Sequence, residues 1–155
     1  MKLLHTLTCL FVLSVMLPGY VEASETGDLS PQQIEQLVHA VTVAQNKATT
    51  RGATIDDVDC LYAMYTADFI YEHPGMDDVY TREHLYSNHV RALHQGRYEE
   101  YDPVEDAYRI VDMMYGDNAA AVQRIQARLD DAPHRMAVFE FENGKVARIR
   151  EYWNY

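Results

Sequence analysis

The sequence predicts a single α+β domain, in which three helices and one strand are followed by four consecutive strands. Three observations support this prediction. A capping signal at Ser30-Pro31 precedes apolar residues at helical spacing. From residue 107 onwards, runs of strand-forming residues alternate with turn signals. One of these turns is Asn143-Gly144, the strongest short-range signal for a hairpin. Such a layout favours a curved, mainly antiparallel sheet wrapped round three helices.

Capping residues and apolar spacing predict the first two helices. Ser30 can cap a helix that begins at Pro31, with Gln33 at the capping-box position, and Gly52 can end it in the left-handed conformation. A second, shorter helix is predicted over residues 56–65. The inward-facing residues of the two helices are Ile34, Leu37, Val38, Val41, Ala44, Ala48, Val58, Leu61, Tyr62 and Tyr65.

A strand and a third helix come next. Residues 66–73 are rich in strand-forming side chains, and Pro74-Gly75 ends the run. Thr81 caps the third helix and Gly96 closes it. One broad face of this helix is mainly apolar and carries Leu85, Tyr86, His89, Val90 and Leu93. The remaining strands are predicted over residues 107–115, 119–129, 135–142 and 145–153.

The first 23 residues have the pattern of a secretory signal peptide. Lys2 gives a positive start, residues 3–17 are almost all apolar, and small residues precede a cleavage point after Ala23. We therefore expect residues 24–155 to form the domain and to be periplasmic or secreted. A retained membrane anchor is the alternative, but the apolar run is shorter than the roughly 20 residues that a spanning helix needs. After cleavage we expect no membrane association.

Charge and cysteine content limit the classes of partner. Lys and Arg number 13 against 24 Asp and Glu, which gives a net charge of −11 and no overall basic surface for nucleic acid. Cys60 is the only cysteine after residue 23, so the exported chain cannot form an intramolecular disulfide. A small core residue and a reactive thiol are both open interpretations of Cys60.

Three segments carry a resemblance to a known superfamily. They are residues 67–74 (ADFIYEHP), the helix of residues 81–96, and residues 139–153 (FEFENGKVARIREYW). Over about residues 30–154 the chain resembles the nuclear transport factor 2-like superfamily and, within it, the SnoaL-like group. The resemblance implies a cone-shaped fold with a deep apolar cavity for a small organic ligand, and a homodimer paired through the outer face of the sheet. A monomer whose outer face is covered by water is the alternative.

The resemblance also implies a position for a general base. In the ketosteroid isomerases of this superfamily, the general-base carboxylate ends the first strand, directly before a proline. Here His73 precedes Pro74, and an imidazole with a pKa of about 6.5 can take up a proton at neutral pH. Tyr71 shares that strand face and is the candidate hydrogen-bond donor. The alternative is that His73 only closes the strand.

The last strand supplies a candidate partner for this histidine. Arg148 and Arg150 alternate with inward-facing positions, so we expect Glu151 and Trp153 to face the cavity. Glu151 could then orient the ring of His73. A surface ion pair with Arg148 or Arg150 is the alternative. The residues expected to bind substrate are Phe69, Trp153, Phe139 and Val38.

No cofactor or metal is expected. His84, His89 and His94 lie five residues apart, which separates neighbouring members by about 140° around a helix and prevents convergence on one ion. The sequence contains no glycine-rich phosphate loop or nucleophile elbow. Two functions stay open: cofactor-free isomerisation, cyclisation or dehydration of a small carbonyl compound, and ligand binding or protein assembly without turnover.

Overall fold

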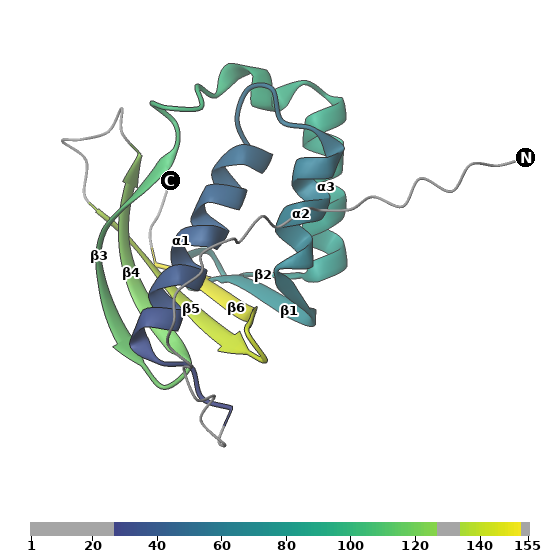
Figure 1. The fold of residues 1–155 in the computed structure, drawn as a ribbon. Helices are drawn as coiled ribbons and strands as arrows, with labels where there is room; N and C mark the ends of the chain where they lie inside the picture. The colour runs from purple at the N-terminus through teal and green to yellow at the C-terminus, as the bar shows by residue number, and fades with distance from the viewer. Residues whose placement is uncertain (1–26, 127–133, 153–155) are drawn as a thin grey trace, which may run out of the picture.

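The computed structural model describes residues 27–126 and 134–152, which form three α-helices and a six-stranded sheet (Figure 1). The helices are α1 (Pro31–Ala48), α2 (Ile55–Ala63) and α3 (Arg82–His94), with short 3₁₀ helices η1 (Pro74–Met76) and η2 (Arg97–Glu100). The strands are β1 (Tyr65–His73), β2 (Asp78–Thr81), β3 (Tyr108–Gly116), β4 (Ala119–Gln126), β5 (Arg135–Glu142) and β6 (Lys145–Glu151). The predicted α+β class is confirmed.

The sheet is mainly antiparallel and strongly curved. Its strand order is β2-β1-β6-β5-β4-β3, and β1 with β6 is the parallel pair among the described strands. Register shifts interrupt the β1–β6, β3–β4 and β5–β6 pairings, and such irregularities bend a sheet. All three helices lie on the same side of this curved sheet (Figure 1).

Local sequence signals produce the element boundaries. Ser30 accepts a hydrogen bond from the backbone N–H of Gln33, and the Gln33 side chain accepts one from the backbone N–H of Ser30. Thr54 and Asp57 form the same capping box at α2. Between β5 and β6 both turn residues have positive φ, which suits an Asn-Gly type I′ turn.

The hydrophobic core fills the space between the helices and the sheet. Its fully buried members include Ile34, Val38, Val41, Val58, Leu61, Phe69, Val122, Phe139, Val146 and Ile149. Leu37 and the apolar face predicted for α3 pack against this core while partly exposed. Within the described ranges, no helix combines the length and apolar character needed to span a bilayer.

Three predicted boundaries and one missing element need correction. The first helix ends at Ala48 and not beside Gly52, and the hydroxyls of Thr49 and Thr50 donate hydrogen bonds to carbonyl oxygens of its last turn. The second helix ends at Ala63 instead of residue 65, because Tyr65 already pairs with Val146 in the sheet. The sequence prediction missed β2, a four-residue strand that pairs with β1 across the turn at Pro74. The strand predicted over 119–129 is described up to Gln126, and residues 127–129 lie outside the described residues. The strand predicted over 145–153 ends at Glu151, so Tyr152 lies beyond its end, and Trp153 lies outside the described residues.

Candidate functional site

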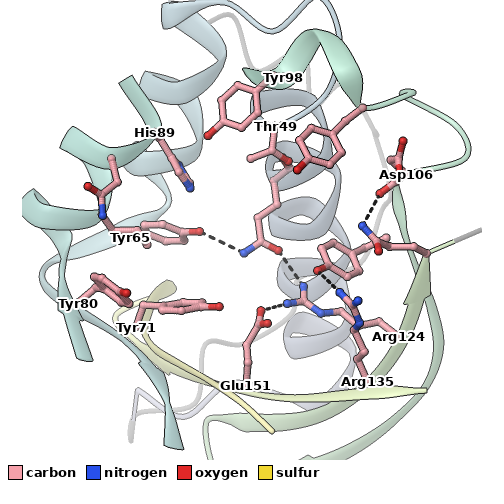
Figure 2. A pocket seen from close by; sticks show the side chains of 16 residues that line it. Thr49, Tyr65, Tyr71, Tyr80, His89, Tyr98, Asp106, Arg124, Arg135 and Glu151 are labelled. Atoms are coloured by element: carbon pink, nitrogen blue, oxygen red, sulfur yellow. Dashed lines mark hydrogen bonds and ion pairs between the residues drawn. The ribbon is translucent and has the colours of Figure 1, made fainter. Parts of the chain in front are cut away.

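A cavity of about 590 Å³ lies between α3, the C-terminal end of α1 and the sheet. Every strand of the sheet contributes at least one side chain to it. Tyrosine is the dominant residue type, with six tyrosines from β1, β2, β3, η2 and the segment after η2. The lining residues are Gln45, Thr49, Tyr65, Tyr71, Tyr80, Leu85, Asn88, His89, Tyr98, Tyr101, Asp106, Tyr108, Arg124, Gln126, Arg135 and Glu151 (Figure 2).

One wall of the cavity is built on a buried ion pair. Arg124 of β4 and Glu151 of β6 form a hydrogen-bonded ion pair, and their side chains are 1% and 4% exposed. Because water does not screen charges at such depth, removing either partner leaves the other uncompensated. The pair therefore fixes two charged groups at a defined position on the cavity wall.

A chain of hydrogen bonds extends from this pair across the cavity (Figure 2). Arg124 Nη1 donates to Gln45 Oε1 at 3.0 Å, and Gln45 Nε2 donates to Tyr65 Oη at 3.4 Å. Burial raises the pKa of the Tyr65 phenol well above its usual range, so Tyr65 stays protonated. Helix α1 and strands β1, β4 and β6 are thereby linked through one continuous polar chain.

Aromatic stacking holds the Arg124 guanidinium from another side. Its Cζ atom lies 4.3 Å from the centre of the Tyr108 ring and 5.6 Å from that of Phe139. The Tyr108 hydroxyl in turn accepts a hydrogen bond of 3.0 Å from Arg135 Nη1. These contacts restrict the orientation of Arg124 and so of the carboxylate that it binds.

The opposite wall carries a neutral imidazole. His89 of α3 has its Nδ1 atom 3.4 Å from the hydroxyl of Tyr62, and its ring contacts Tyr62 and Tyr98 edge-on. Burial lowers the pKa of His89 to about 4 and raises the pKa of Tyr98 to about 12. Both side chains are therefore uncharged at neutral pH and can donate or accept hydrogen bonds.

The structure brings two of the three predicted catalytic residues to the cavity. Tyr71 and Glu151 line it, whereas His73 is 2% exposed and is not among the lining residues. The parallel register pairs Glu72 with Arg150, which are the residues directly before His73 and Glu151. Yet the ion-pair partner of Glu151 is Arg124, a residue that neither sequence interpretation considered.

The alternative interpretation of Glu151 as a surface residue is wrong. Glu151 is 3% exposed, and Arg150 of the same strand pairs with Glu72 and Glu140 instead. The reason is alternation along β6, which turns Arg148 and Arg150 to the outer face while Glu151 faces inwards, as the strand pattern predicts.

The predicted substrate-binding residues lie elsewhere. Val38, Phe69 and Phe139 are completely buried in the hydrophobic core and are not among the residues that line the cavity. These three side chains fill the core between the helices and the sheet, beside the cavity. Trp153 lies outside the described residues.

Sequence reasoning missed Arg124 and Gln45, although both break a regular apolar pattern. In β4, Ala120, Val122 and Arg124 alternate on the buried face, so an arginine occupies a core position. In α1, Gln45 follows Ile34, Val38 and Val41 at helical spacing and precedes Ala48 on the same stripe. A polar residue at an apolar position of such a pattern was the available signal.

The described residues contain no group of three or more histidine, cysteine or acidic side chains that could hold a metal ion. Cys60 is partly buried in α2. The lining residues offer carboxylates, guanidinium groups, phenols, amides and an imidazole.

Comparison with solved structures identifies the fold. No family model matches this chain, and no curated protein does either. A SnoaL-like protein of unknown function from Burkholderia thailandensis matches with a TM-score of 0.59 at 13% identity, over 83% of this chain and 99% of that one. An LEH-like epoxide hydrolase from M. tuberculosis matches with a TM-score of 0.54 at 18% identity, over 79% and 84%.

A third match is an NTF-2 like protein of unknown function from Burkholderia xenovorans, with a TM-score of 0.52 at 19% identity over 78% of this chain and 82% of that one. At these identities the likeness concerns the fold. The order of helices, the bent mixed sheet and these matches agree with the resemblance found in the sequence. The chain has the nuclear transport factor 2-like fold of the SnoaL-like and ketosteroid isomerase-like proteins.

Proposed function

We propose that this protein binds a small, flat, oxygenated organic molecule in the tyrosine-lined cavity. The observation that carries the proposal is the lining itself: six tyrosines surround a space of about 590 Å³ whose wall holds the buried Arg124–Glu151 pair. Phenol rings offer flat apolar surface together with hydroxyl groups, a combination that suits a planar ligand with oxygen substituents.

Mass spectrometry of small molecules that co-purify with the protein tests this proposal. Asn88→Trp should displace the bound molecule, because Asn88 lines the cavity and an indole there would fill part of it. Ser87→Trp is the matched control, since the neighbouring Ser87 is exposed and is not among the lining residues. Equal recovery of a ligand from both variants, or of none from the unmodified protein, would contradict the proposal.

Export belongs to the same proposal. The sequence of residues 1–23 supports secretion with cleavage after Ala23, so the ligand would be met in the periplasm or outside the cell. Cell fractionation and the mass of the mature chain test this point. A chain that keeps its first 23 residues in the cytoplasm would contradict it.

Cofactor-free acid–base catalysis in this cavity is a second candidate function. It is favoured by the presence of an ionisable carboxylate, Glu151, and a neutral imidazole, His89, on facing walls of one cavity. The catalytic roles predicted for His73, Tyr71 and Glu151 belong to this candidate. Conversion of the co-purified molecule by fresh protein, followed by mass spectrometry, would distinguish catalysis from binding alone.

A further inference from the structure

The carboxylate of Glu151 has one oxygen that the protein leaves unsatisfied. Oε1 accepts the hydrogen bond from Arg124 Nη2. Oε2 has no hydrogen-bond partner within residues 27–126 and 134–152. Because Glu151 is only 3% exposed, bulk water does not supply one either. Glu151 lines the cavity, and Figure 2 shows its carboxylate turned towards the cavity interior. Oε2 itself is covered by the surrounding side chains, so a donor on a bound molecule reaches it when one of these side chains moves aside.

A buried acceptor of this kind sets a requirement for its partner. Buried polar atoms are nearly always hydrogen-bonded, because an unsatisfied one loses its contact with water and gains nothing in return. A hydroxyl or N–H group would satisfy Oε2 with a charge-assisted hydrogen bond. An ether oxygen cannot donate a hydrogen bond and would place its lone pairs against those of the carboxylate.

The charges of the cavity indicate whether that donor is ionic. Among the described lining residues, the two arginines Arg124 and Arg135 balance the two acidic residues Asp106 and Glu151. Glu151 is already neutralised by its ion pair with Arg124. The cavity therefore has no formal excess of either sign with which to attract an ion, and it favours an uncharged molecule.

We propose that the cavity is selective for uncharged, flat molecules that carry a hydroxyl group, and that this hydroxyl donates a hydrogen bond to Glu151 Oε2. This inference rests on the function proposed above and adds a ligand class to it. The tyrosine rings would contact the flat body, and Oε2 would select the hydroxyl end.

Three probes with the same ring system test the inference on the unmodified protein. These are 2-naphthol, 2-methoxynaphthalene, which replaces the donor by an ether, and naphthalene, which controls for the size of the methoxy group. Titration calorimetry at pH 7 should show 2-naphthol binding about tenfold more tightly than either of the others, since one charged-acceptor hydrogen bond is gained.

The matched variants are Glu151→Gln and Glu140→Gln. Glutamine at 151 can accept from Arg124 through its oxygen, which leaves an amide donor where Oε2 stood. A hydroxyl and an ether oxygen can both accept from that amide, so the preference for 2-naphthol over 2-methoxynaphthalene should disappear or reverse. Glu140 also forms an ion pair with an arginine, Arg150, but on the outer face of the sheet, and its replacement should leave the preference unchanged. If Glu151→Gln does not fold, the three-probe comparison decides alone.

The outcomes separate the two proposals. Equal affinities for the three probes would overturn the inference and leave the proposed function standing, because Oε2 would then be satisfied by water or by Arg124 Nε. Tighter binding of 2-methoxynaphthalene than of 2-naphthol would overturn it as well. If none of the three probes binds, the result contradicts the proposed function itself, and the inference, which rests on that function, is overturned as well.

Discussion

At the scale of single residues, the cavity depends on charges that cannot be removed one at a time. Replacing Arg124 by Met leaves the Glu151 carboxylate buried without its counter-ion, and breaking such a pair from one side costs about 3–5 kcal/mol. We therefore predict that Arg124→Met lowers the free energy of unfolding by about that amount, as measured by urea denaturation.

The double variant Arg124→Met/Glu151→Met is the control for this prediction. It removes both charges, and apolar replacements of a buried pair are often close to neutral. We expect the double variant to be more stable than Arg124→Met alone. Glu151→Met completes the comparison. A double variant whose loss of stability equals or exceeds the sum of the losses in Arg124→Met and Glu151→Met would show that packing, and not the uncompensated charge, sets the cost.

His89 gives the stability of the protein a defined dependence on pH. Its pKa is about 4 in the folded protein against 6.5 when unperturbed, because burial disfavours the charged ring. Below pH 6.5 the unfolded chain binds a proton that the folded chain does not, so His89 contributes a loss of stability as pH falls towards 4. The full effect is about 3 kcal/mol.

The prediction is that His89→Gln flattens this part of the curve of unfolding free energy against pH between 7 and 4. His94→Gln, on the exposed side of the same helix, should leave the curve as it is in the unmodified protein. Parallel curves for the unmodified protein and His89→Gln would mean that His89 titrates alike in both states.

Single residues were the level at which the sequence was least informative. Alternation correctly turned Tyr71 and Glu151 towards the inside, because a strand side chain can face only two ways. It could not find the partner of Glu151, since Arg124 lies 27 residues earlier on a strand that is not adjacent to β6. Long-range pairing depends on sheet order, which periodicity does not encode.

At the scale of elements, the backbone conformation of two glycines predicts opposite effects of a Gly→Ala substitution on stability. Gly144 has φ of +72°, a conformation that costs a residue with a Cβ about 1 kcal/mol or more. Gly116 has no positive φ, and an added Cβ would meet the Ala119 carbonyl oxygen at an ordinary 3.9 Å. We predict that Gly144→Ala destabilises the protein.

Gly116→Ala should leave stability unchanged or raise it by up to about 1 kcal/mol, because alanine restricts the unfolded chain. Thermal unfolding of the two variants side by side measures the contrast. If both variants lost the same stability, the positive φ of Gly144 in the type I′ turn could not be the cause of the loss in Gly144→Ala.

Element boundaries were predictable where a local signal exists. The capping box at Ser30 and the turn at Asn143 act within a few residues, and the strand predicted over 135–142 is found with the same ends. Strand β2 has four residues and no apolar alternation of its own. It is a strand because it pairs with β1, which a short window of sequence does not show.

At the scale of the whole molecule, the outer face of the sheet is the surface on which the homodimer prediction depends. Glu72 links Arg150 at 2.6 Å and Arg148 at 3.7 Å, and Arg150 also pairs with Glu140. Beside these ion pairs, Met136 and Tyr152 are 43% and 45% exposed. Charges paired within the chain and exposed apolar side chains together make a surface that a second copy could cover.

We predict a homodimer paired through this face. In a twofold interface each exposed side chain faces the partner's copy of the same patch, so Met136→Glu would bury new negative charges in an acidic protein and should give a monomer. Val43→Glu is the matched control, since Val43 is 65% exposed on α1, and it should remain dimeric. Light scattering at micromolar concentration measures both. A monomeric unmodified protein would contradict the dimer, and a dimeric Met136→Glu would place the interface elsewhere.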